Sequence, residues 1–123
     1  MKPLSVVILP DNSRNAESLA KSLHNHFRVV NLAGSLDELR YAIPRHAADV
    51  IIVDLEQAGM DDILSLHKDF SATDIVCTHR LADERMWTQA LAAGAVDCCA
   101  SSDVRAIVLA ASHTGFATHA HAA

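Results

Sequence analysis

The chain has 123 residues, half of them apolar, and a net charge of −5. This length suits one compact domain rather than two, and the apolar content is sufficient for a hydrophobic core. An acidic chain offers no basic face, and no apolar run approaches the ~18 residues of a membrane span, so we expect neither direct nucleic-acid binding nor a membrane partner.

Short apolar runs alternate with amphipathic segments, which is typical of a parallel sheet flanked by helices. Residues 5–9 are the first apolar run and predict a buried strand, followed by a helix that Asn12 or Ser13 caps. Residues 28–32 predict the second strand. Residues 35–38 contain an S-x-x-E capping box, which predicts the start of a second helix.

The second half of the chain continues this alternation. We expect strands over residues 49–55, 74–77 and 96–99 and helices over residues 60–70 and 83–93. Gly94 suits the C-terminal end of a helix, because a positive φ has no steric cost for glycine. Ser102 is expected to cap a last helix, which is buried through Val104, Ile107, Val108 and Ala111.

These elements predict an α/β domain with a doubly wound, five-stranded parallel sheet, (βα)₅. We expect the flavodoxin-like strand order 2-1-3-4-5, which makes strands one and three neighbours. Residues 1–112 form this domain. Residues 113–123 are small and polar without periodicity, so we expect a flexible tail or the start of a linker.

The carboxyl ends of parallel strands meet at one edge of the sheet, beside the point where the strand order reverses. Asp11, Asp54, Thr78 and Ser101 all lie at or just after predicted strand ends. Neighbouring carboxylates repel each other and favour a hard cation such as Mg²⁺. An aspartate beside such a cation can accept a phosphoryl group, because the metal neutralises the charge that develops.

Four segments of the chain resemble a known family. They are VVILPDN at residues 6–12, IIVDLEQAGMDD at 51–62, IVCTHR at 75–80 and AAGAVDCCASSD at 92–103. With these segments, residues 5–111 resemble the receiver domain of bacterial two-component response regulators. The resemblance implies a signalling domain rather than an enzyme. It also implies a sensor histidine kinase or a phosphotransfer protein as the partner.

The resemblance assigns roles to residues at the strand ends. It implies that Asp54 is phosphorylated and that the Thr78 hydroxyl contacts the phosphoryl group. Asp11, Asp54 and the backbone carbonyl of Glu56 are the implied Mg²⁺ ligands. Receiver domains often dimerise through the fourth helix, fifth strand and fifth helix. In this chain Met86, Trp87, Val104 and Arg105 lie in those elements.

The chain departs from the family's pattern at five positions. Pro10 replaces an acid, Ala58 a loop proline, Cys98 an aromatic residue, Ser101 a lysine and Ser102 a proline. Without one acid we expect a weakened Mg²⁺ site, and without the lysine an altered switch. Lys2, Lys21 and Lys68 lie at no strand end, and His79 and Arg80 can replace the lysine only by reaching across. The alternative is a pseudo-receiver, an interaction module for a protein or ligand that works without phosphate.

Other kinds of site fit less well. The turn over residues 10–13 has no glycine and carries an acid, which argues against a phosphate-binding loop. Residues 1–9 lack the features of a signal peptide, and three cysteines without C-x-x-C spacing indicate reduced, partly buried thiols. We therefore expect a cytoplasmic protein. If the protein regulates transcription, another domain or a partner must contact DNA.

Overall fold

The structure is a computed structural model that describes residues 5–11 and 15–112. The strands are β1 (Ser5–Leu9), β2 (Val29–Leu32), β3 (Val50–Asp54), β4 (Asp74–His79) and β5 (Asp97–Ala100). The helices are α1 (Asn15–His24), α2 (Leu36–Arg45), α3 (Met60–Asp69) and α4 (Glu84–Ala92), and a further helix spans residues 104–112. The expected cap at Asn12 or Ser13 and the expected tail at 113–123 lie outside the described residues.

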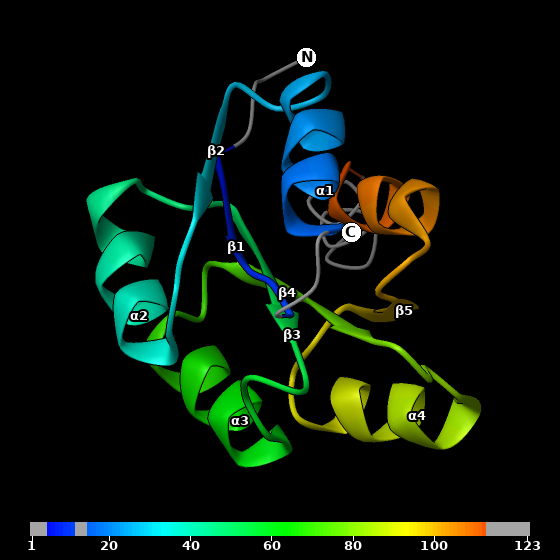
Figure 1. The fold of residues 1–123 in the computed structure, drawn as a ribbon. Coiled ribbons are helices and arrows are strands. Elements are labelled where there is room, and N and C mark those ends of the chain that lie inside the picture. Colours follow the sequence, from blue (N-terminus) through cyan, green and yellow to red (C-terminus); the bar gives the residue numbers. More distant parts are fainter. Residues whose placement is uncertain (1–4, 12–14, 113–123) are drawn as a thin grey trace, which may run out of the picture.

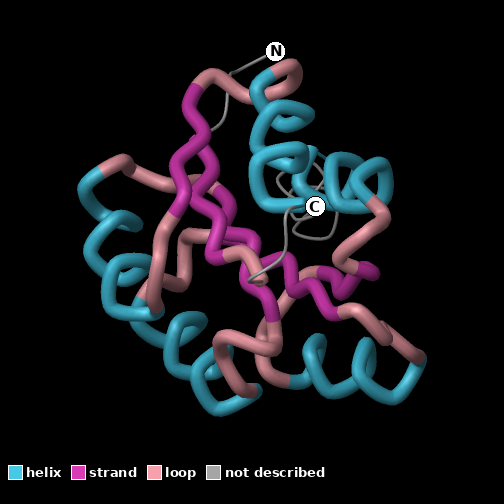
Figure 2. The backbone as a smooth tube through the Cα atoms, in the orientation of Figure 1, coloured by secondary structure: helices cyan, strands magenta, loops and turns pink. Residues whose placement is uncertain are grey.

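The strands form one parallel sheet in the order β2-β1-β3-β4-β5. This confirms the predicted fold class and strand order. The strands cross the middle of the molecule, and helices lie on both sides of them (Figures 1 and 2). The order reverses between β1 and β3, so the loops after these two strands diverge at the carboxyl edge and leave room for a site.

Each face of the sheet has its own hydrophobic core, because alternate strand residues point to opposite faces. On one face, α2, α3 and α4 pack through Leu39, Ile63 and Ala90, among others, against residues such as Ile51. The other face is covered by α1 and helix 104–112, with Ile52 among the strand residues beneath them. Figure 1 shows α2, α3 and α4 on one side of the strands and α1 with helix 104–112 on the other. Both cores hold the strand ends in a fixed position.

Two predicted helix ends are confirmed and one predicted cap is wrong. The Ser35 side chain accepts a hydrogen bond from the Glu38 N–H at 3.2 Å, and Gly94 follows α4 with a φ of 113°. The last helix is capped by Asp103 and not by Ser102, since the Asp103 side chain accepts from the Ala106 N–H at 3.1 Å. Either residue type makes a good cap, so the sequence pattern did not distinguish the two neighbours.

Strand β4 runs two residues further than its apolar run predicts. Thr78 and His79 still pair with Cys99 and Ala100 of β5. Backbone pairing with a neighbour, rather than side-chain hydropathy, therefore sets where this strand ends. The extension carries the Thr78 side chain to the same level of the sheet as Asp54, its partner in β3.

The three thiols are more deeply buried than expected. Cys77, Cys98 and Cys99 are all buried and form no disulfide. Cys77 and Cys98 belong to the core beneath α2, α3 and α4, whereas Cys99 belongs to the opposite core. Adjacent residues of β5 thus place their sulfur atoms on opposite faces of the sheet. Within the described residues, no helix combines the length and the apolar character needed to cross a bilayer.

Candidate functional site

Asp54 is a fully buried carboxylate at the end of the central strand β3, with no exposed surface. Its Oδ1 accepts a hydrogen bond from the Thr78 hydroxyl at 3.0 Å. Its Oδ2 accepts one from the Glu56 N–H at 2.9 Å. Both oxygens are therefore held, one by a hydroxyl that can rotate and one by a backbone group in the β3–α3 turn.

The protein environment raises the pKa of Asp54 above its ordinary value. Burial is the main cause, because it disfavours the charged form. The hydrogen bonds from Glu56 and Thr78 lower the pKa, and the negative charges of Asp11 and Glu56 raise it. A buried carboxylate with this balance of forces favours a nearby positive charge.

This raised pKa predicts how the stability of the chain depends on pH. In the folded state Asp54 holds its proton to a higher pH than in the unfolded state, so the unfolding free energy falls as pH rises through that interval. We expect Asp54→Asn to gain stability relative to the native chain as pH rises above 3.8, the ordinary pKa of the group. The expected gain in the free energy of unfolding is about 1.4 kcal/mol for every tenfold increase in the proton affinity of Asp54 on folding. Urea unfolding at several pH values measures it, and parallel curves for the two proteins would contradict it.

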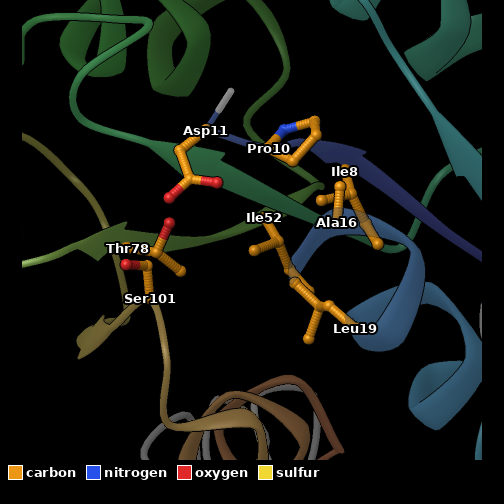
Figure 3. Close-up of a pocket in the computed structure, with 8 residues that line it drawn as sticks. All are labelled: Ile8, Pro10, Asp11, Ala16, Leu19, Ile52, Thr78 and Ser101. Carbon is orange, nitrogen blue, oxygen red and sulfur yellow. The ribbon is translucent and has the colours of Figure 1, made fainter. Parts of the chain in front are cut away.

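Asp11 follows β1 and lies next to this carboxylate at the carboxyl edge. It lines a small cavity together with Thr78 and Ser101 at one end and apolar side chains such as Ile52 and Leu19 at the other. Figure 3 shows the Asp11 carboxylate directed toward the end where the hydroxyls of Thr78 and Ser101 lie. The cavity volume is about 10 Å³, which is room for about one water molecule. The structure therefore brings Asp11, Asp54, Thr78 and Ser101 to one edge of the sheet.

The donor set at this edge fits a hard divalent cation. Asp11 and Asp54 supply two carboxylates, and Mg²⁺ is commonly held by one or two carboxylates with several waters. The charge of Asp11 raises the pKa of Asp54, a repulsion that a cation between the two would relieve. Over residues 5–11 and 15–112 no three His, Cys, Asp or Glu side chains are placed to share a metal, so backbone and water oxygens must complete any coordination shell.

An ion pair beside Asp54 was not expected from the sequence. Arg80 donates through Nε to Glu56 Oε1 at 2.7 Å, joining the loop after β4 to the loop after β3. From the sequence, only the backbone carbonyl of Glu56 has an expected role, and Arg80 is expected to replace the lysine only by reaching across. Each residue lies two positions after a site residue, Asp54 or Thr78, and that spacing is the signal that could have suggested the pair.

Four of the five positions that depart from the family's pattern line the cavity or pack in a core. The Ser101 N–H donates to the His79 carbonyl at 3.0 Å, and its side chain lines the cavity. Pro10 lines the same cavity, while Ala58 and Cys98 are buried in the core beneath α2, α3 and α4. Burial raises the pKa of the Cys98 thiol to about 11. A small buried thiol thus stands where the family has a ring.

The side chains expected at a contact face differ in exposure. Trp87 on α4 is 44% exposed, and its Nε1–H donates to Asp97 Oδ1 at 3.1 Å, which joins α4 to the edge strand β5. Arg105 is exposed on helix 104–112, whereas Met86 and Val104 are partly buried against the two cores. The exposed part of this surface therefore lies around Trp87 and Arg105.

No family model and no curated protein matches the sequence. Solved structures do match the fold. The signal receiver domain of a DNA-binding response regulator from Colwellia psychrerythraea has a TM-score of 0.75 and 16% identity, covering 86% of this chain and 93% of that one. The orphan response regulator HP1043 of H. pylori has a TM-score of 0.74 and 17% identity, with coverages of 86% and 91%.

A response regulator from Burkholderia pseudomallei has a TM-score of 0.76 and 23% identity, covering 98% of this chain and 73% of that one. That structure contains a phosphorylated aspartic acid, a calcium ion and citrate. At these identities the likeness establishes the fold, which is that of response-regulator receiver domains.

Proposed function

We propose that this chain, which has the fold of response-regulator receiver domains, acts in two-component signalling by accepting a phosphoryl group on Asp54. The observation that carries the proposal is the buried Asp54 carboxylate at the end of β3, held by Thr78 and lying next to Asp11. A sensor histidine kinase or a phosphotransfer protein would supply the phosphoryl group. The phosphorylated aspartic acid in the Burkholderia structure supports this reading by analogy.

The hydrogen bonds of Asp54 suggest which oxygen reacts. Oδ2 is bound by the Glu56 N–H, which the turn fixes, whereas Oδ1 is bound by the Thr78 hydroxyl, which can rotate. Oδ1 would attack phosphorus, so that an O–P bond forms while the bond from phosphorus to the donor breaks. Thr78 would then turn its hydroxyl to a phosphoryl oxygen.

Asp11, Asp54 and the carbonyl of Glu56 are the groups that would hold Mg²⁺. When bound, the cation neutralises charge on the transferred phosphoryl group. Pro10 contributes no carboxylate, so we expect weaker Mg²⁺ binding than in a receiver domain with two acids at this turn.

Intact-mass measurement tests the proposal directly. The native chain is incubated with Mg²⁺ and acetyl phosphate and is expected to gain the mass of one phosphoryl group, which Asp54→Asn should not gain. Asp37→Asn, which changes an exposed carboxylate in the first turn of α2, is the matched control and should behave like the native chain. Equal labelling of native chain and Asp54→Asn would place the phosphoryl group elsewhere and contradict the proposal.

A second candidate is a pseudo-receiver that binds a protein or ligand without phosphate. It is favoured by Ser101, which lines the cavity with a neutral hydroxyl where the family has a cation. A native chain that gains no mass would favour this candidate. In either case we propose the surface of α4, β5 and helix 104–112 around Trp87 as the contact face, including for a homodimer, since β5 is an edge strand.

A further inference from the structure

The Glu56–Arg80 ion pair is tied to both hydrogen bonds of Asp54. Glu56 gives its backbone N–H to Asp54 Oδ2 and its side chain to Arg80. Arg80 lies two residues after Thr78, whose hydroxyl donates to Asp54 Oδ1. Asp54, Glu56, Arg80 and Thr78 are therefore linked in a closed circuit, which ties the Arg80 side chain to the two residues that bind the Asp54 carboxylate.

Arg80 is held through one nitrogen. Its Nε–H contacts Glu56, and within the described residues its two terminal nitrogens make no hydrogen bond. Its side chain is 69% exposed, so it can move without breaking core packing. The neighbouring His79 uses Nδ1 to accept a hydrogen bond from the Leu81 N–H at 3.0 Å, so this nitrogen is not available to donate to a phosphoryl oxygen.

A phosphoryl group on Asp54 would be a stronger partner for Arg80 than Glu56 is. A phosphoryl group carries a charge of about −1.5 to −2, more than the single negative charge of the Glu56 carboxylate. Arg80 contacts Glu56 through one N–H only, whereas a guanidinium can bind phosphate oxygens through two parallel N–H groups. Ser101 can donate one hydrogen bond but cannot neutralise charge. A phosphoryl group on Asp54 would therefore lack a cationic partner at Ser101, and Arg80 is a cation held in the neighbouring loop.

We propose that Arg80 binds the phosphoryl group on Asp54 in place of the missing lysine, and that Glu56 competes for it. Before phosphorylation, Glu56 holds Arg80; afterwards Arg80 turns to the phosphoryl oxygens and releases the Glu56 side chain. Phosphorylation would then change the loop that leads into α3, because that loop loses the ion pair between Glu56 and Arg80. This inference rests on the proposed function.

Beryllofluoride with Mg²⁺ is the probe, since it imitates a phosphoryl group on a carboxylate, and NMR titration gives its affinity. We expect Arg80→Gln to bind it roughly tenfold more weakly than the native chain. Glu56→Gln keeps the backbone N–H and carbonyl but frees Arg80, so we expect it to bind about threefold more tightly. Arg85→Gln, which removes an exposed arginine from α4, is the matched control and should leave the affinity unchanged.

Opposite changes in Arg80→Gln and Glu56→Gln support the proposal, because a merely structural ion pair would shift both variants in the same direction. If the native chain binds beryllofluoride and Arg80→Gln binds it equally well, the proposal is overturned while the proposed function stands. If the native chain does not bind beryllofluoride, both fail. Arg80→Lys separates charge from geometry: it should recover part of the affinity, and full loss with a folded spectrum would mean that the planar fork is required.

Discussion

Ser101→Lys is expected to tighten beryllofluoride binding roughly tenfold and to enlarge the accompanying NMR shifts. Ser101 lines the cavity together with Asp11 and Thr78. An ammonium group at position 101 would therefore lie near the Asp11 carboxylate and the Thr78 hydroxyl. A bond between charged groups contributes about 1.5–3 kcal/mol, which corresponds to at least a tenfold change in affinity. The shift in conformation should grow with it, because a ligand moves a population by its differential affinity for the two states.

The same substitution should make Arg80 dispensable. In the native chain we expect Arg80→Gln to cost roughly tenfold in affinity, and in the Ser101→Lys background about threefold or less. The affinities of the four proteins form a double-mutant cycle. A cycle in which the two effects multiply without coupling would show that the lysine and Arg80 do not serve the same phosphoryl group.

Gly94→Ala is expected to destabilise the fold by about 2–4 kcal/mol. Gly94 has a φ of 113°, which side chains rarely adopt, and an added Cβ would come closer than 3.0 Å to three side-chain atoms of His67 on α3. Backbone strain and steric overlap therefore add. Urea unfolding measures the loss. His67→Ala in the same chain should recover only the part due to overlap with the ring atoms Cγ and Cδ2, because the His67 Cβ, 2.8 Å from the added Cβ, remains.

Gly59→Ala is the control for this substitution. Gly59 has a φ of −79°, and a Cβ added there meets nothing within 4 Å. The loss of unfolding free energy in Gly59→Ala should stay below about 1 kcal/mol, because the substitution affects only the N-cap of α3. Equal losses at Gly59 and Gly94 would show that the position of Gly94 has no special requirement.

The fold was predictable because the buried strands of a parallel sheet appear in the sequence as short apolar runs. Residues 50–54 are all buried, and such a run predicts a central strand without any knowledge of its neighbours. The convergence of Asp11, Asp54 and Thr78 followed from the same reasoning, since parallel strands end at one edge. The cap at Asp103 did not, because Ser102 beside it satisfies the same chemical preference.

The Glu56–Arg80 pair shows what periodicity cannot predict. Both residues lie in loops, where no repeating pattern tells which way a side chain turns. Their contact depends on the distance between two loops that only the packed sheet fixes. The sequence indicated that a cation was missing at Ser101, but where a replacement could come from is a property of the folded chain.

Chemical labelling of the three buried thiols can report local opening of the sheet. The thiolate is the form that attacks a labelling reagent, and burial raises the pKa of Cys98 to about 11 and of Cys99 to about 12, with the pKa of Cys77 raised as well. Cys98 and Cys99 lie in the edge strand β5, on opposite faces, and Cys77 lies in the next strand inward. A labelling reagent would therefore count how often β5 leaves the sheet, with Cys77 marking the deeper and rarer openings.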